Sequence, residues 1–281
     1  MWTRGRGRPL AFSPRGRSGR FPIIVWRNIR VLILLVVLLW AATHTWVERN
    51  SSTRWKEPLW VGVFPINADG SPTAQHYIDS LSDRAFLDIE DFTAREAHRY
   101  GRQLEQPVHV LLYPQLRQAP PQLERNTRLL GTAWWSFKLR WFAWRTLDFG
   151  GRPPPRIRLL VLYHDPSALQ ELPDSHGMQK GLLGVVHAFA LPSMAETNSI
   201  VIAHEMLHTL GATDKYDQAN GLPLFPLGFA EPDRKPLYPQ EKAEIMAGRR
   251  PLSPQDAQMP AALDAVVIGP ATAAEIRWTH R

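Results

Sequence analysis

The chain contains no cysteine, so neither disulfide bonds nor thiolate metal ligands are available to it. Any metal ion must therefore be held by histidine, aspartate or glutamate. Acidic residues are also absent from the N-terminal part of the chain. The first 30 residues contain eight arginines and no aspartate or glutamate. The net charge of +7 thus belongs to an N-terminal arm, and the rest of the chain is close to neutral. We expect no nucleic-acid partner, since the body offers no basic surface for phosphates.

One long apolar run follows the basic arm. It extends from Val31 to Ala42 without interruption and continues to Val47, about 25 Å of helix against a hydrocarbon core of roughly 30 Å. Trp26 and Trp46 are placed to lie at the two membrane interfaces, and the preceding arginines indicate a cytoplasmic N-terminus. A cleaved signal peptide and a buried core helix are the alternatives.

This topology divides the chain into four parts. We predict a disordered tail at 1–22, a transmembrane signal-anchor helix at 23–47, a linker at 48–58 and a folded domain at 59–281. The last of these parts would then lie outside the cytoplasm, and in the periplasm if the source is a Gram-negative bacterium.

The hydrophobic pattern of residues 59–281 predicts an α+β domain. Runs rich in aliphatic and β-branched residues predict strands near residues 59–66, 108–113, 157–163 and 182–190. The pair Ser71-Pro72 begins a helical stripe that runs toward Gly101. A second such pair, Ser253-Pro254, predicts a C-terminal helix through Leu263.

An aromatic-rich helix is predicted over residues 130–147. Five of its apolar residues share one helix face, at spacings of 4, 3, 4 and 3: Leu130, Trp134, Phe137, Trp141 and Trp144. Two interpretations of this face are open. It completes the core, which we favour, or it lies against a membrane surface.

The stretch HEMLHTLGATD, from His204 to Asp214, predicts a metal site. His204 and His208 are four residues apart, so on a helix their imidazoles project from one face and can share a divalent ion. Gly211 can adopt a positive φ and turn the chain, which lets Asp214 return to the ion as a third ligand. Glu205 is placed to meet a bound water rather than the metal. The rival third ligands are Glu231, Glu241 and Glu244.

The pattern H-E-x-x-H-x-x-G-x-x-D resembles the zinc-binding consensus of the metzincin clan of metalloproteases, and its final Asp is similar to that of snapalysin-type small neutral proteases. EIMAG, from Glu244 to Gly248, resembles the clan's Met-turn, with Met246 as its methionine. The resemblance implies a metzincin-like zincin domain with a twisted, mostly parallel sheet, a long helix, an active-site helix, a Met-turn and a C-terminal helix, here preceded by one transmembrane helix. It also implies an edge strand that pairs with substrate, for which residues 184–192 are the candidate.

The resulting hypothesis is a membrane-anchored zinc metalloendopeptidase that acts on peptide or protein substrates. His204, His208 and Asp214 would bind Zn²⁺, and Glu205 would serve as general base and acid. By analogy Tyr216 supports the oxyanion or a ligand, unless it is structural, and His187 contacts substrate, unless it too is structural. The alternatives are a membrane-tethered, non-catalytic metal-binding scaffold and a zinc amidohydrolase that acts on another amide.

Overall fold

The computed structural model describes residues 29–33, 35–36, 53–123, 129–169, 171–179 and 182–279. The chain divides into two units, Met1–His44 and Thr45–Arg281. In the first unit, residues 29–33 and 35–36 are helical and exposed. The tail predicted at 1–22 lies outside the described residues.

The prediction of a transmembrane helix over residues 23–47 is wrong. No helix within the described parts of the chain is long and apolar enough to cross a membrane. The predicted localisation outside the cytoplasm depended on that helix, so this prediction is wrong too. The predicted fold class is corrected in the same way, because it included a membrane span before the α+β domain.

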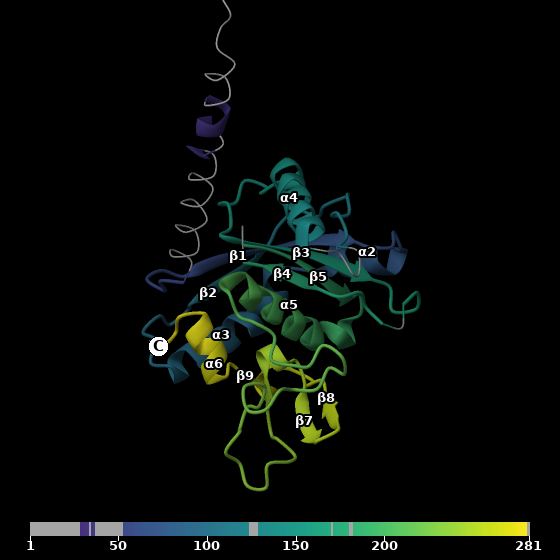
Figure 1. Ribbon diagram of the computed structural model, residues 1–281. Coiled ribbons are helices and arrows are strands. Elements are labelled where there is room, and N and C mark those ends of the chain that lie inside the picture. The colour runs from purple at the N-terminus through teal and green to yellow at the C-terminus, as the bar shows by residue number, and fades with distance from the viewer. Residues whose placement is uncertain are drawn as a thin grey trace, which may run out of the picture. The chain divides into compact units, whose positions relative to one another are not determined.

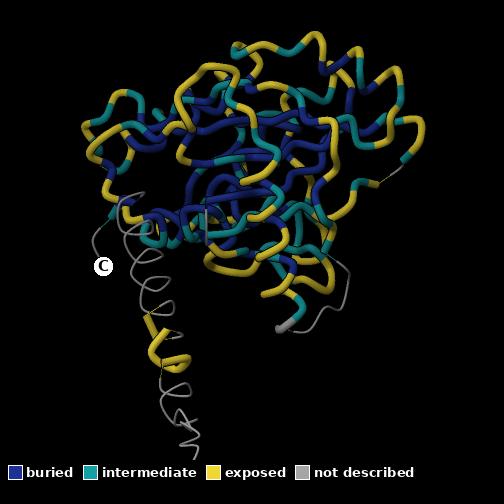
Figure 2. Tube along the Cα trace, turned by 90° about the horizontal axis from the view of Figure 1, so that it is seen from above, coloured by how far each residue is buried: buried dark blue, intermediate teal, exposed yellow. Residues whose placement is uncertain are grey.

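A five-stranded mixed sheet forms the centre of the second unit (Figure 1), with the order β2-β1-β3-β5-β4. Four strands run parallel: β1 (Leu59–Asn67), β2 (Val108–Leu112), β3 (Ile157–His164) and β5 (Leu183–Phe189). They lie where the hydrophobic runs predict strands, because parallel strands are covered on both faces and read as continuous apolar sequence. Figure 2 shows that the buried residues, in dark blue, gather in the middle of this unit.

The fifth strand, β4 (His176–Met178), pairs antiparallel with β5 and forms one edge of the sheet. The prediction that residues 184–192 form this edge is therefore wrong, since β5 lies between β3 and β4. With three residues, β4 is too short to produce a hydrophobic alternation that could be recognised in the sequence.

Three helices pack on one face of the sheet: α2 (Pro72–Ser80), α3 (Leu87–Arg99) and α5 (Ala195–Leu210). The single helical stripe predicted from Ser71 is divided, because Leu81 and Ser82 are extended and a 3-10 turn at Asp83–Phe86 precedes α3. The buried side chain of Asn198 fixes α5 to the sheet. It accepts a hydrogen bond from Phe189 N at 3.2 Å and donates one to Phe189 O at 2.9 Å.

The aromatic-rich helix α4 (Leu129–Thr146) covers the opposite face of the sheet (Figure 1). Its buried side chains are Trp135, Leu139 and Ala143, which pack in a second core cluster with strand residues such as Phe64. The predicted core face points away from the sheet, and its four described rings are exposed by 60, 51, 54 and 75% at Trp134, Phe137, Trp141 and Trp144. The interpretation that this face completes the core is therefore wrong. Both sides of the helix are apolar, so spacing alone could not rank them.

The C-terminal helix predicted from Ser253-Pro254 is also wrong. Arg250–Ser253 (β7) and Asp256–Gln258 (β8) form an antiparallel hairpin at this point. Ser253 Oγ accepts a hydrogen bond from Gln255 N at 3.2 Å, so it caps the turn of the hairpin instead of a helix. The last part of the chain contains a short parallel pair, β6 (Ala243–Glu244) and β9 (Val266–Val267), and the short helix α6 (Pro270–Glu275).

The orientation of α4 can be tested by two truncations, two residues apart. Leu139→Ala removes a fully buried side chain and should lower the free energy of unfolding by about 2–5 kcal/mol. Phe137→Ala removes an exposed ring and should change it by less than about 0.5 kcal/mol. Urea unfolding of both variants gives the comparison, and equal losses would contradict this packing.

Candidate metal centre

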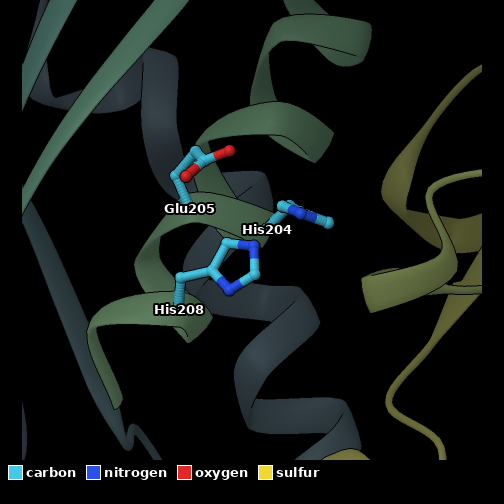
Figure 3. A group of neighbouring side chains, drawn as sticks. All are labelled: His204, Glu205 and His208. Atoms are coloured by element: carbon cyan, nitrogen blue, oxygen red, sulfur yellow. The ribbon is translucent and has the colours of Figure 1, made fainter. Parts of the chain in front are cut away.

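Helix α5 brings three potential ligands together. The ligand atoms of His204, Glu205 and His208 lie within 4.8 Å of one another. Figure 3 shows the three side chains projecting from neighbouring turns of the helix. The two imidazole rings lie 4.7 Å apart between centroids, as expected for residues one turn apart.

A main-chain carbonyl orients each histidine ring. His204 Nδ1 lies 2.9 Å from Ile245 O, and His208 Nδ1 lies 2.8 Å from Ala212 O. A carbonyl can only accept a hydrogen bond, so in the neutral rings each Nδ1 carries the proton. Each Nε2 then presents a lone pair, the tautomer that a metal-ligating histidine needs.

Asp214 completes the convergence. Its Oδ1 lies 3.3 Å from His204 Nε2 and 3.0 Å from His208 Nε2, yet this buried oxygen makes no hydrogen bond of acceptable geometry. Two ligand atoms that are each ~2.0–2.1 Å from a tetrahedral ion lie roughly 3.3 Å apart. The two nitrogens and the oxygen therefore fit a shared divalent cation better than they fit direct hydrogen bonds.

The chain reaches Asp214 through a glycine, as the sequence predicts. Gly211 ends α5 in the left-handed region at φ 103°, and its N–H bonds the last turn of the helix. This conformation costs an L-residue with a side chain free energy but costs glycine little. After the turn, Gln218 Nε2 donates to Asp214 Oδ2 at 3.2 Å and so holds the other carboxylate oxygen.

The charges of the site shift two carboxyl groups in opposite directions. Burial acts to raise the pKa of Asp214, but the two imidazoles outweigh it and hold that pKa well below its usual range. Burial raises the pKa of Glu205, and the opposing effect of the imidazoles does not cancel it. Asp214 is thus held ionised, as a ligand must be.

Glu205 lies beside the three converging atoms and is only 4% exposed, and its Oε2 has no hydrogen-bond partner among the residues that the structure describes. The edge strand passes directly over it. A Cβ added to Gly177 of β4 would lie 2.4 Å from Glu205 O and 2.5 Å from His208 Cβ. Only glycine allows β4 to approach α5 this closely, and no sequence pattern identified it.

The tight turn around Met246 ties the two segments of candidate ligands together. Met246 is completely buried in a 3-10 turn, Ile245–Ala247, which ends at Gly248 in the left-handed region. Ile245 O orients the His204 ring, while Met246 O accepts a hydrogen bond from Lys215 N at 2.9 Å, one residue after Asp214. The turn therefore positions a ligand from the helix and a ligand from the loop at once.

Glu244, a rival third ligand in the sequence, holds this turn instead. Its Oε2 accepts hydrogen bonds from Met246 N and Ala247 N at 2.7 and 3.0 Å. Its Oε1 accepts from Gly269 N and Thr272 Oγ1 at 3.1 and 2.6 Å. The carboxylate is fully buried and joins the turn to the start of α6.

The other two rivals are also engaged elsewhere. Glu231 and Glu241 both pair with Arg234, at 3.3 and 2.6 Å. Their carboxylates therefore belong to a separate ion-pair cluster in the irregular segment after Asp217.

Tyr216 and His187 have different surroundings. Burial, and then the charge of Asp214, raises the pKa of Tyr216, so this half-buried phenol lies within electrostatic reach of the site. His187 Nδ1 lies 2.8 Å from His164 Nε2. Burial and His164 lower the pKa of His187 to about 4, which leaves it neutral at pH 7.

A cavity of about 250 Å³ adjoins the histidines, and both His187 and His204 line it together with Glu205. Most of its other lining side chains are apolar: Leu172, Pro173, Ile200, Val201 and Met259. The arrangement therefore offers a pocket for an apolar group next to the catalytic candidate Glu205.

The chain matches no model of a known protein family, and a search of curated proteins also found no match. The interpretation of the site accordingly depends on its motif and geometry.

The contribution of Glu244 can be measured against a nearby control. Glu244→Gln places an amide NH₂ opposite two hydrogen-bond donors in either orientation, and should lower the free energy of unfolding by roughly 2–4 kcal/mol. It should also weaken zinc binding, since Ile245 O would shift. Glu241→Gln changes an exposed carboxylate and should leave both properties near their wild-type values. Chemical denaturation and a chelator competition give the two readouts, and parallel behaviour of the variants would contradict the role of Glu244.

Proposed function

We propose that the protein is a zinc-dependent peptidase with a metzincin-type site. The observation that supports this most directly is the convergence of His204 Nε2, His208 Nε2 and Asp214 Oδ1 beside Glu205. Two imidazoles and one carboxylate suit zinc, and three protein ligands are typical of catalytic sites that keep a position open. Structural zinc sites usually have four.

The residues divide into holding and reacting groups. His204, His208 and Asp214 would hold the ion, which when bound would supply a Lewis acid that lowers the pKa of a water molecule toward about 7. Glu205 would take a proton from the attacking water and pass it to the nitrogen of the leaving amine. Its unpartnered Oε2 is available for the first of these transfers.

Substrate would enter between β4 and the C-terminal part of the domain. The edge position of β4 allows an extended peptide to add as a further strand. An apolar side chain of that peptide fits the cavity next to His204, with neutral His187 in its wall. Tyr216, close to Asp214, is the proposed donor to the developing oxyanion.

Two alternatives share the same metal ligands. A non-catalytic metal-binding protein would not need Glu205 for any measurable property, whereas a zinc amidohydrolase would need it but would leave peptides intact. The unpartnered Oε2 of the buried Glu205 favours a hydrolase over the non-catalytic protein, because a buried polar atom without a hydrogen bond costs stability unless it has a function.

Removal of the third ligand should be measurable as a loss of zinc affinity. Asp214→Ala is expected to weaken zinc binding at least about 100-fold, since even residues behind the ligands typically contribute 10–100-fold. Glu231→Gln, a change at a rival ligand that pairs with Arg234, should bind zinc like the wild type. Competition with a chromogenic chelator gives both affinities. Unchanged zinc binding in Asp214→Ala would remove Asp214 from the ligand set.

The role of Glu205 can be separated from metal binding. Glu205→Gln should keep its zinc but lower the rate of casein or peptide-library cleavage by about 10²–10⁴-fold. Glu196→Gln changes an exposed carboxylate on the same helix and should retain wild-type activity. Full activity in zinc-loaded Glu205→Gln would contradict the mechanism, and cleavage of only non-peptide amides by the wild type would favour the amidohydrolase.

A further inference from the structure

The outer face of α4 presents a stripe of aromatic rings that the metal centre does not use. The stripe consists of Trp134, Phe137, Trp141 and Trp144, each at least half exposed. On a helix of ~3.6 residues per turn these residues fall within an arc of about 80°, centred roughly opposite the buried Trp135, Leu139 and Ala143. The helix therefore uses one apolar side for the core and leaves a second one in contact with solvent.

The rings of the stripe are arranged in two stacked pairs. Trp134 and Phe137 lie 5.5 Å apart at an interplanar angle of 16°, and Trp141 and Trp144 lie 5.1 Å apart at 39°. Each full aromatic side chain offers ~150–250 Å², so the four exposed parts add up to an apolar patch on the order of 400–500 Å². The largest patch on a typical monomer is about this size and often marks an interaction site.

Basic residues border the stripe on both sides. Lys138 and Arg145 lie along one border and Arg140 along the other, by the same helical geometry, and all three are exposed. The helix contains no acidic residue, and Asp148, just beyond its end, accepts a hydrogen bond from Gly150 N. An aromatic stripe between two rows of cations is the pattern of a helix that lies in the surface of an anionic bilayer.

We propose that α4 is a membrane-surface docking helix, which places its aromatic rings among lipid headgroups while Lys138, Arg140 and Arg145 contact anionic lipids. This docking is peripheral and requires no helix that crosses the bilayer. Tryptophan favours this depth because its ring is largely apolar and its N–H remains hydrogen-bonded. Since α4 and α5 lie on opposite faces of the sheet (Figure 1), the docked protein keeps its metal centre directed away from the lipid.

The charges of α4 argue against a second copy of the chain and against a protein partner as the occupant of this face. A second copy stacked on the stripe would bring two sets of three cations together, with no acidic residue on either helix to pair with them. A protein partner would bury the stripe in the core of an interface. Such cores are depleted in charged residues, whereas three cations border this stripe. A lipid surface satisfies both the rings and the cations.

The absence of cysteine permits a test at a single site in the full chain. Trp144→Cys introduces the only thiol at the most exposed ring of the stripe, where an environment-sensitive nitrobenzoxadiazole label reports contact with lipid. Phe225→Cys is the matched control. That ring is 60% exposed and belongs to the irregular segment on the α5 side of the sheet. The label reports contact with lipid only at the residue that carries it. Binding of vesicles by the arginines of residues 1–30 therefore does not affect the comparison between positions 144 and 225.

The proposal expects a blue shift and a severalfold rise in emission at position 144 with vesicles of equal parts phosphatidylcholine and phosphatidylserine. It expects no change in emission at position 225. In a triple variant that combines Lys138→Glu, Arg140→Glu and Arg145→Glu, it expects the response at position 144 to be at least tenfold weaker. Zinc content and circular dichroism monitor the fold of each variant. A vesicle-bound protein with no shift at 144, or with equal shifts at both positions, would overturn the proposal. A shift at 144 that depends on protein concentration instead of lipid would assign the face to a second copy, and one induced only by an added acidic protein would assign it to a protein partner.

Discussion

The hydrogen bond between His204 Nδ1 and Ile245 O is the contact on which the candidate metal centre depends. It joins the helix to a turn 41 residues later in the chain and determines the tautomer of the ring. The same turn holds the loop of Asp214 through Met246 O, and the buried carboxylate of Glu244 holds the turn. Displacement of the turn would therefore disturb two ligands together, so the site is a property of the whole C-terminal half of the domain.

This construction explains why so many polar groups are buried around the site. Burial of an unpaired carboxylate or amide is costly, and here almost every such group has a main-chain or side-chain partner. Within the described part of the chain, two oxygens of the site are without hydrogen bonds, Glu205 Oε2 and Asp214 Oδ1. They lie where the proposed chemistry requires an acceptor for a proton and a ligand for a cation, which links the remaining cost to function.

The sheet separates two surfaces with different chemistry. On the α5 side lie the converging imidazoles and the apolar cavity, whereas the α4 side presents aromatic rings bordered by cations. The two helices contact different core clusters and meet at the edge strand, where the rings of Trp135 on α4 and His176 on β4 lie 6.1 Å apart between centroids. The exposed rings of α4 point away from that contact, so the proposed docking and the proposed catalysis can be tested by separate mutations.

The sequence by itself determined the local chemistry. The i, i+4 spacing of His204 and His208 needs only helical geometry, the turn at Gly211 needs only a residue without a side chain, and the buried parallel strands are long apolar runs. Features that depend on partners distant in the chain were decided by the tertiary structure. The short edge strand β4 has no recognisable hydrophobic periodicity. Glu244 remains a candidate metal ligand until the four hydrogen-bond donors around it are known. Helix α4 has two apolar sides, and only packing against the sheet could select the buried one. The same holds for the segment after Ser253, where a local cap-and-proline signal was overruled by pairing with a neighbouring strand, since hydrogen bonds to another segment outweigh a weak local preference.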